Sequence, residues 1–109
     1  MFAVIYRWQV VPGLEAQFEA GWRRGTERIA AEFGGWGSRL HAAGDGIYIA
    51  YAQWPDEPTW QKAMDNHMRY DEPETRRKFV EALAKPETAD DLVFAMPVTD
   101  DVLDHIPGV

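Results

Sequence analysis

Two polar side chains are expected on apolar helical faces, where each could do chemistry. His67 shares a helical face with Trp60 and Met64, and an imidazole in that position could accept a proton near neutral pH. The alternative is a buried structural histidine bonded to a backbone carbonyl. Arg76 shares the inward face of a later helix with Phe79, so its guanidinium could bind a phenolate or a carboxylate. The alternative is that its charged end reaches solvent.

Large aromatic side chains are unusually frequent, with 5 Trp, 4 Tyr and 5 Phe in 109 residues. Several of them fall on the faces expected to point inward, and together with a methionine they would suit a pocket for a flat ring. These pocket candidates are Trp8, Trp22, Trp60, Met64 and Phe79. Ordinary core packing explains the same residues, so both interpretations stay open.

Composition and spacing exclude several classes of function. The formal charge of −7 disfavours nucleic acid and anionic membranes as partners. There is no Cys, and the three histidines, His41, His67 and His105, lie far apart in the chain. Gly44-Asp45-Gly46 is typical of a hairpin turn and not of a phosphate-binding loop. We therefore expect no metal and no other cofactor.

The elements that would position these residues follow from the apolar periodicity and the turn signals. Helices are predicted to begin near Leu14, after Asp56 and after Asp71, with the two aspartates as N-caps. Glycines at 34 and 35 should end the first helix. Strands are predicted over residues 2–11, 36–42, 47–54 and 92–96.

The resulting order, βαββααβ, predicts an α+β fold, a ferredoxin-like sandwich. Both faces of the first and third strands carry apolar residues, although all the crossover helices should cover one face only. We therefore expect a homodimer in which the two sheets face each other. The residues expected on the uncovered face include Arg7, Arg39, His41 and Gln53, which we interpret as an interface hydrogen-bond network rather than a second site. Residues 1–98 form the expected domain, and 99–109 form an acidic tail expected to lie against the partner.

Three stretches of the chain resemble the antibiotic biosynthesis monooxygenase family. They are Ala3 to Gly13, Gly34 to His41, and Tyr51 to Asp56 followed by an aromatic-led helix. The resemblance covers about residues 2 to 96 and implies a dimeric α+β barrel with a cavity between helices and sheet in each subunit. It also implies a polar pocket residue at Tyr6. Family members include oxygenases that act on phenols or quinols without metal or flavin, and haem-degrading enzymes.

The haem-degrading branch fits this sequence poorly. That branch uses an Asn on the first strand, a Trp on the second helix and a His on the following helix. By spacing, these fall at Tyr6, near Ala63 and near Pro73, and none of the three is kept.

The sequence thus predicts a cofactor-independent monooxygenase that acts on a small aromatic or quinol-like compound, with His67, Arg76 and Tyr6 as the catalytic candidates. The alternative is a non-catalytic dimeric barrel that binds a small molecule or a protein partner. The N-terminus resembles neither a signal peptide nor a membrane span, so we expect a cytoplasmic protein.

Overall fold

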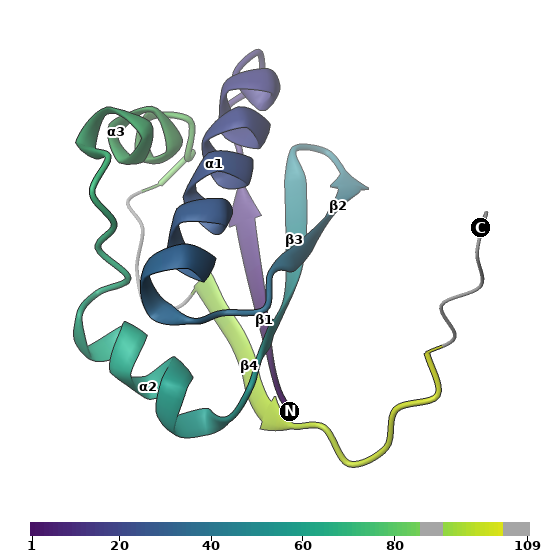
Figure 1. Ribbon diagram of the computed structural model, residues 1–109. Coiled ribbons are helices and arrows are strands. Elements are labelled where there is room, and N and C mark those ends of the chain that lie inside the picture. The colour runs from purple at the N-terminus through teal and green to yellow at the C-terminus, as the bar shows by residue number, and fades with distance from the viewer. Residues whose placement is uncertain (86–90, 104–109) are drawn as a thin grey trace, which may run out of the picture.

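The computed structural model describes residues 1–85 and 91–103, and it confirms the predicted order of elements (Figure 1). The elements are β1 (Phe2–Gln9), α1 (Glu15–Phe33), β2 (Ser38–Gly44), β3 (Ile47–Trp54), α2 (Glu57–Asp65), α3 (Pro73–Glu81) and β4 (Leu92–Pro97). Within the described ranges, no helix is both long and apolar enough to cross a membrane.

The four strands form one antiparallel sheet in the order β2-β3-β1-β4. The central pair runs in an unbroken register from Phe2 opposite Trp54 to Gln9 opposite Ile47. β4 pairs with the other edge of β1, with an irregularity between Ile5 and Tyr6. This strand order is that of the ferredoxin-like sandwich, so the predicted α+β fold class is confirmed.

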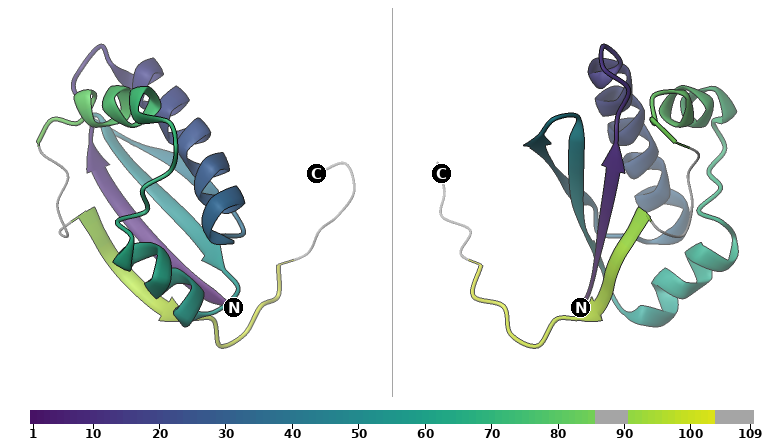
Figure 2. Two further views of the ribbon diagram at one scale, coloured as in Figure 1. Left: turned by 60° about the vertical axis from the view of Figure 1, so that its left-hand side comes forward. Right: turned by 180° about the vertical axis from the view of Figure 1, so that it is seen from behind.

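All three helices cover the same face of the sheet, as Figure 2 shows from two sides. Alternate residues of a strand point to opposite faces. On β1, Val4 and Trp8 are buried beneath the helices. On the other face, Phe94 of β4 is 58% exposed and Met96 is 37% exposed. We call this second side of the sheet the open face.

The helix ends follow the sequence in two cases. The carboxylate of Asp56 accepts a hydrogen bond from the Thr59 backbone N–H at 2.8 Å, which confirms the predicted N-cap of α2. Gly34 ends α1 with a left-handed φ of 82°. The prediction for α3 is wrong by one residue, because the N-cap is Glu72 and not Asp71.

The prediction that α2 continues to His67 is also wrong. α2 ends at Asp65 in a Schellman motif, in which His67 N donates to Met64 O and Met68 N donates to Ala63 O, both at 2.8 Å. His67 occupies the position after the cap with a φ of 56°, where glycine is the usual residue. The side chain therefore leaves the apolar face of α2, and His67 is exposed instead of buried.

The core consists of two apolar clusters on the helix-covered side of the sheet. One lies beneath α1 and α3 and contains Trp8, Phe18 and Phe79. The other lies beneath α2 and contains Phe2 and Trp60. Tyr6 packs against both clusters.

Candidate functional site

A cavity of about 600 Å³ lies between the helices and the sheet. Its volume is within the range of small-molecule sites, roughly 300–1,000 Å³. The residues that line it include Tyr6 and Trp8 of β1, Trp22 of α1, and Arg76 and Phe79 of α3. The structure therefore brings most of the sequence-predicted site residues to one cavity, and Met64 and His67 also line it.

Aromatic rings form much of the wall. The rings of Tyr6 and Trp8 stack with centroids 5.5 Å apart and an interplanar angle of 9°. Phe79 meets Trp8 edge-on, with centroids 5.7 Å apart. The Arg76 guanidinium carbon lies 5.9 Å from the centroid of the Phe79 ring, a distance at which a cation is attracted to the ring face. These surfaces suit a flat, electron-rich ring.

Trp60 is the exception among the predicted pocket residues. It is buried and packs against Phe2, with ring centroids 5.3 Å apart, and it does not line the cavity. Its position on α2 turns it towards Phe2 and Trp54 on the two central strands, so it contributes to the core below α2. The pocket prediction is wrong for this residue.

The connection from α2 to α3, residues 66–72, closes one side of the cavity, and we call it the strap. Four consecutive residues of the strap, 67–70, line the cavity. Tyr70 is buried against α1, whereas His67 and Arg69 are exposed. The predicted environment of His67 among apolar side chains is therefore absent, and the hypothesis of a buried structural histidine is wrong.

Charged groups on α1 hold the far end of the strap. Glu72 forms ion pairs with Arg24 and, at 3.5 Å, with Arg28, and it also accepts from Thr75 Oγ1 at 3.0 Å. The hydrogen bond from Arg24 lowers the pKa of Glu72, with a further contribution from Thr75. Glu32 accepts a hydrogen bond from the backbone N–H of Asp71 at 3.2 Å. The hydrogen bond from Arg28 lowers the pKa of Glu32.

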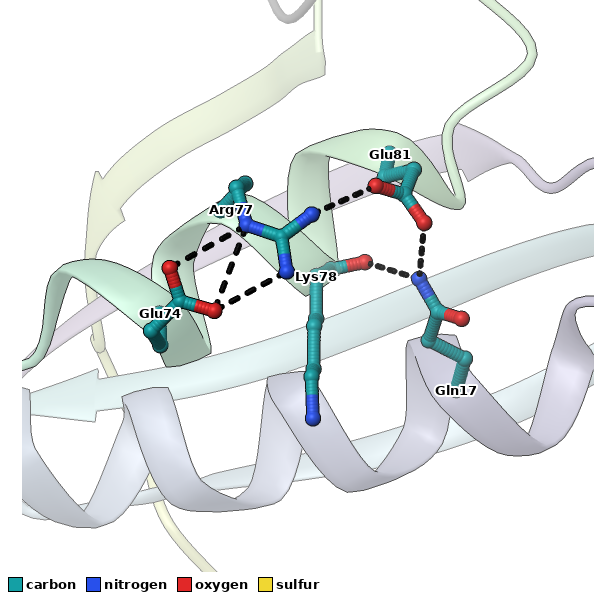
Figure 3. Close-up of polar contacts among 5 residues, drawn as sticks. All are labelled: Gln17, Glu74, Arg77, Lys78 and Glu81. Carbon is teal, nitrogen blue, oxygen red and sulfur yellow. Dashed lines mark hydrogen bonds and ion pairs between the residues drawn. The ribbon is translucent and has the colours of Figure 1, made fainter.

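Polar contacts also position α3 on α1, as the close-up in Figure 3 shows. Gln17 Nε2 donates to the backbone oxygen of Lys78 at 2.9 Å and to Glu81 Oε1 at 3.3 Å. Arg77 bridges Glu74 and Glu81 along α3, with 2.9 Å in each ion pair. Those two pairs are exposed, so they add little to stability. The bonds of Gln17 matter more here because they link the two helices that carry Trp22 and Arg76.

Asp91 is a cavity residue that the sequence analysis missed. It is 5% exposed, it lines the cavity, and it is the buried charged residue among those that the structure describes. A buried carboxylate on a cavity wall can accept a proton from a bound ligand. Two consecutive aspartates, Asp90 and Asp91, just before a predicted strand were the only sequence signal for it, and aspartates are common in turns.

A second hollow of about 490 Å³ lies on the open face. Arg39, His41 and Tyr51 line it from the sheet, and residues 100–103 line it from the tail. The register places His41 opposite Ile49, and His41 Nδ1 lies 3.1 Å from the Ile49 backbone oxygen. Residues 104–109 and His105 lie outside the described residues. Among the described residues, no group of three or more His, Asp or Glu side chains has the arrangement of a metal site.

Comparison with known proteins supports the fold. No protein-family model and no curated protein sequence matches the chain. Rv0793 from Mycobacterium tuberculosis superposes with a TM-score of 0.62 at 19% identity, over 94% of this chain and 98% of that one. A protein named "Putative antibiotic biosynthesis monooxygenase" from Bordetella bronchiseptica gives a TM-score of 0.59 at 24% identity, over 78% of this chain and 87% of that one.

These likenesses establish the architectural class. The chain has the ferredoxin-like α+β fold of the Bordetella protein, so its resemblance to the antibiotic biosynthesis monooxygenase family is confirmed at the level of the fold. At these identities, the reaction and the substrate have to be argued from the cavity itself.

Proposed function

We propose that the protein is a cofactor-independent monooxygenase that acts on a small aromatic or quinol-like compound bound in the cavity. The observation that carries this proposal is the cavity of about 600 Å³ with aromatic walls and a few polar groups. Trp8, Trp22 and Phe79 would hold the ring, and Tyr6 and Arg76 would supply hydrogen bonds. The named monooxygenase of the same fold supports the same class of reaction.

The reaction requires three things of the protein. It must deprotonate the electron-rich ring, stabilise the resulting oxyanion and limit the access of water to the oxygenated intermediate. For a quinol, the substrate supplies all four electrons that O₂ accepts. The O–O bond breaks, one oxygen atom replaces a ring C–H with C–OH, the two phenolic hydroxyls become carbonyls, and their two hydrogens leave with the other oxygen atom as water. Arg76 is half-buried on the wall and is the proposed donor to the oxyanion.

The proposed proton acceptor is Asp91 in place of His67. Asp91 is buried on the cavity wall, whereas His67 lies exposed on the strap. A buried base on the cavity wall is less accessible to bulk water than one on the exposed strap, so it suits the removal of a phenolic proton. Removal of a general base lowers a rate by about 10²–10⁴-fold.

Oxygen uptake with a panel of quinols and polyphenols, with a metal chelator present, tests this function. We expect turnover by the unaltered protein, a loss of about 10²–10⁴-fold in Asp91→Asn, and a much smaller loss in His67→Gln. The melting temperature of each variant and its affinity for the aromatic substrate distinguish a catalytic effect from unfolding. A large loss of turnover in His67→Gln, with turnover retained in Asp91→Asn, would identify His67 and not Asp91 as the general base.

A second candidate function is ligand binding without turnover in the same cavity. The observation that favours it is the exposure of His67, the base that the sequence predicts. This candidate predicts tight binding of aromatic compounds and no oxygen uptake with any of them.

The partner that we propose is a second copy of the chain, bound through the open face. Ile5, Ile49, Phe94 and Met96 place apolar surface there, beside the polar side chains of Arg39 and His41. The tail contributes Val102, 90% exposed, and Leu103, 61% exposed. Exposed apolar surface with a polar rim is typical of an interaction site.

Self-complementary charge supports a second copy. The tail carries Asp100 and Asp101, and the open face carries Arg7, Arg39 and His41. Asp100 and Asp101 line the same hollow as Arg39 and His41 of their own chain, and we propose that in a twofold dimer each acidic tail also reaches the basic side chains of the other subunit.

A further inference from the structure

We propose that the ligand of the cavity carries a carboxylate as well as an aromatic ring, and that His67 and Arg69 bind this carboxylate at the mouth. The inference deepens the proposed function, because it assigns a chemical class to the compound that the same cavity takes. It rests on the charges of the cavity wall, which differ in sign from those of the whole molecule.

The cavity wall is cationic although the protein is acidic. Among the described residues that line it, Arg69 and Arg76 are cations and Asp91 is the one acidic group, a net formal charge of +1. The whole chain has a formal charge of −7. A positive cavity in a negative protein favours an anion at this place, because charges near a low-dielectric wall are screened less than those on the open surface.

The strap presents two groups that are available to a ligand. Within the part of the chain that the structure describes, the side chains of His67 and Arg69 form no hydrogen bond or ion pair. Arg24, Arg28 and Arg77, by contrast, all pair with glutamates. An Arg side chain left without a carboxylate at the rim of a cavity matches a carboxylate brought by the ligand.

The backbone at His67 supports the same assignment. A residue with a β-carbon at the left-handed position of a Schellman motif is disfavoured relative to glycine, yet the chain has His67 there with a φ of 56°, followed by Met68 with a φ of 47°. Local strain of this kind persists where the surroundings determine it, and it is found most often at functional sites.

The charged and titratable side chains that line the cavity differ in how deeply they are buried. His67 and Arg69 are exposed, Arg76 is half-buried, and Asp91 is buried. A ligand with its carboxylate at the mouth and its ring against Trp8 and Phe79 would therefore direct the far end of the ring inward. A monoanionic carboxylate, rather than a doubly charged phosphoester, matches the net charge of +1.

Calorimetric titration with three naphthalene probes tests this proposal. The probes are 2-naphthoate, the neutral 2-naphthamide of nearly the same shape, and 2-naphthyl phosphate. We expect 2-naphthoate to bind at least tenfold more tightly than 2-naphthamide and more tightly than the phosphate. Equal or tighter binding of either of the other two probes, or no binding of any probe, would overturn the proposal.

Arg69→Gln supplies the second part of the test. It should weaken 2-naphthoate binding about three- to tenfold and leave 2-naphthamide binding unchanged, and Arg69→Lys should restore part of the loss. Arg23→Gln is the matched control, because Arg23 is exposed on α1 and does not line the cavity. An unchanged 2-naphthoate affinity in Arg69→Gln would overturn the assignment.

The outcomes distinguish this inference from the proposed function. Selective 2-naphthoate binding without oxygen uptake from any quinol would contradict the monooxygenase and leave the carboxylate site in place. Oxygen uptake with neutral quinols, together with equal affinity for 2-naphthoate and 2-naphthamide, would support the monooxygenase and contradict the carboxylate site.

Discussion

The hydroxyl of Tyr70 occupies the space that a side chain at Gly25 would need. A β-carbon built on Gly25 would lie 2.9 Å from Tyr70 Oη and 3.2 Å from Tyr70 Cζ. Gly25 is in the middle of α1, where glycine costs about 1 kcal/mol relative to alanine. The close approach of the strap to α1 explains why a glycine is accommodated here, and both residues line the cavity.

Gly25→Ala should therefore destabilise the protein in spite of the better helix propensity of alanine. We expect the free energy of unfolding to fall by up to about 2 kcal/mol, because overpacking costs about 1–3 kcal/mol and the helix regains about 1 kcal/mol. Chemical denaturation at neutral pH measures the change.

The control for this prediction is the same substitution in a Tyr70→Phe background. With the hydroxyl absent, the nearest ring carbon is 3.2 Å away, so the additional cost of Gly25→Ala should be smaller than in the unaltered protein. An equal cost in both backgrounds would show that the Tyr70 hydroxyl is not the obstacle.

Glu72 should make the attachment of the strap depend on pH. The hydrogen bond from Arg24 lowers the folded-state pKa of Glu72 below the ordinary value of 4.5. A carboxyl with a lowered pKa stabilises the fold above that ordinary value, and this stability is lost as the pH falls through the folded-state pKa. Glu72→Gln should then lower the melting temperature by a few degrees at pH 7, and the difference should disappear at strongly acidic pH.

Glu27→Gln is the matched control for Glu72. Glu27 is exposed on the same helix as Arg24 and forms no ion pair within the described ranges. The melting temperatures of Glu72→Gln and the unaltered protein should agree at a pH where Glu72 is protonated in both the folded and the unfolded state. A difference that persists there would contradict the proposed role of the Glu72 carboxylate in holding the strap.

Ile49→Asp should dissociate the proposed dimer. Ile49 is on the open face, opposite Arg7 of β1 and His41 of β2, and burying a carboxylate in the seam carries a desolvation cost that these basic neighbours offset only in part. Light scattering should report about twice 12.4 kDa for the unaltered protein and the single-chain mass for the variant.

Val80→Asp is the control for the dimer. Val80 is 37% exposed on α3, away from the open face, so its substitution should leave the dimer intact. A monomeric unaltered protein at micromolar concentration would contradict the proposed interface.

His67→Gly should raise stability while weakening the binding of 2-naphthoate. Glycine has no steric penalty at the φ of 56° that His67 adopts, so we expect a gain of about 0.5–1 kcal/mol in the free energy of unfolding. A loss of stability in His67→Gly would show that contacts of the His67 side chain stabilise the fold by more than its left-handed backbone conformation costs.

Strong local signals made most of the fold predictable from the sequence. The glycine at position 34 and the capping carboxylate of Asp56 mark helix ends by chemistry that depends on few neighbours. The end of α2 was not predictable, because a histidine occupies the position where glycine would have marked it. Glu72 is the N-cap in place of Asp71 because Pro73, whose fixed φ and missing N–H suit the first helical position, begins α3.

The candidate site was predictable to a smaller extent. Helical periodicity brings Trp22, Arg76 and Phe79 inward, and the structure places all three on the cavity. Periodicity does not distinguish a core position from a cavity position, which is why Trp60 was misplaced. Asp91 and Arg69 lie outside the periodic segments, so only the assembled fold brings them to the wall.

Reaction with isotopically labelled oxygen tests the central claim most directly. A quinol that supports oxygen uptake is incubated with ¹⁸O₂ and the purified protein in the presence of chelator, and the product is analysed by mass spectrometry. We expect one ¹⁸O atom in each product molecule and the other in water, with incorporation lost in Asp91→Asn. Oxygen consumption that leaves the product unlabelled and forms hydrogen peroxide, or no consumption with any aromatic compound that binds, would contradict the monooxygenase.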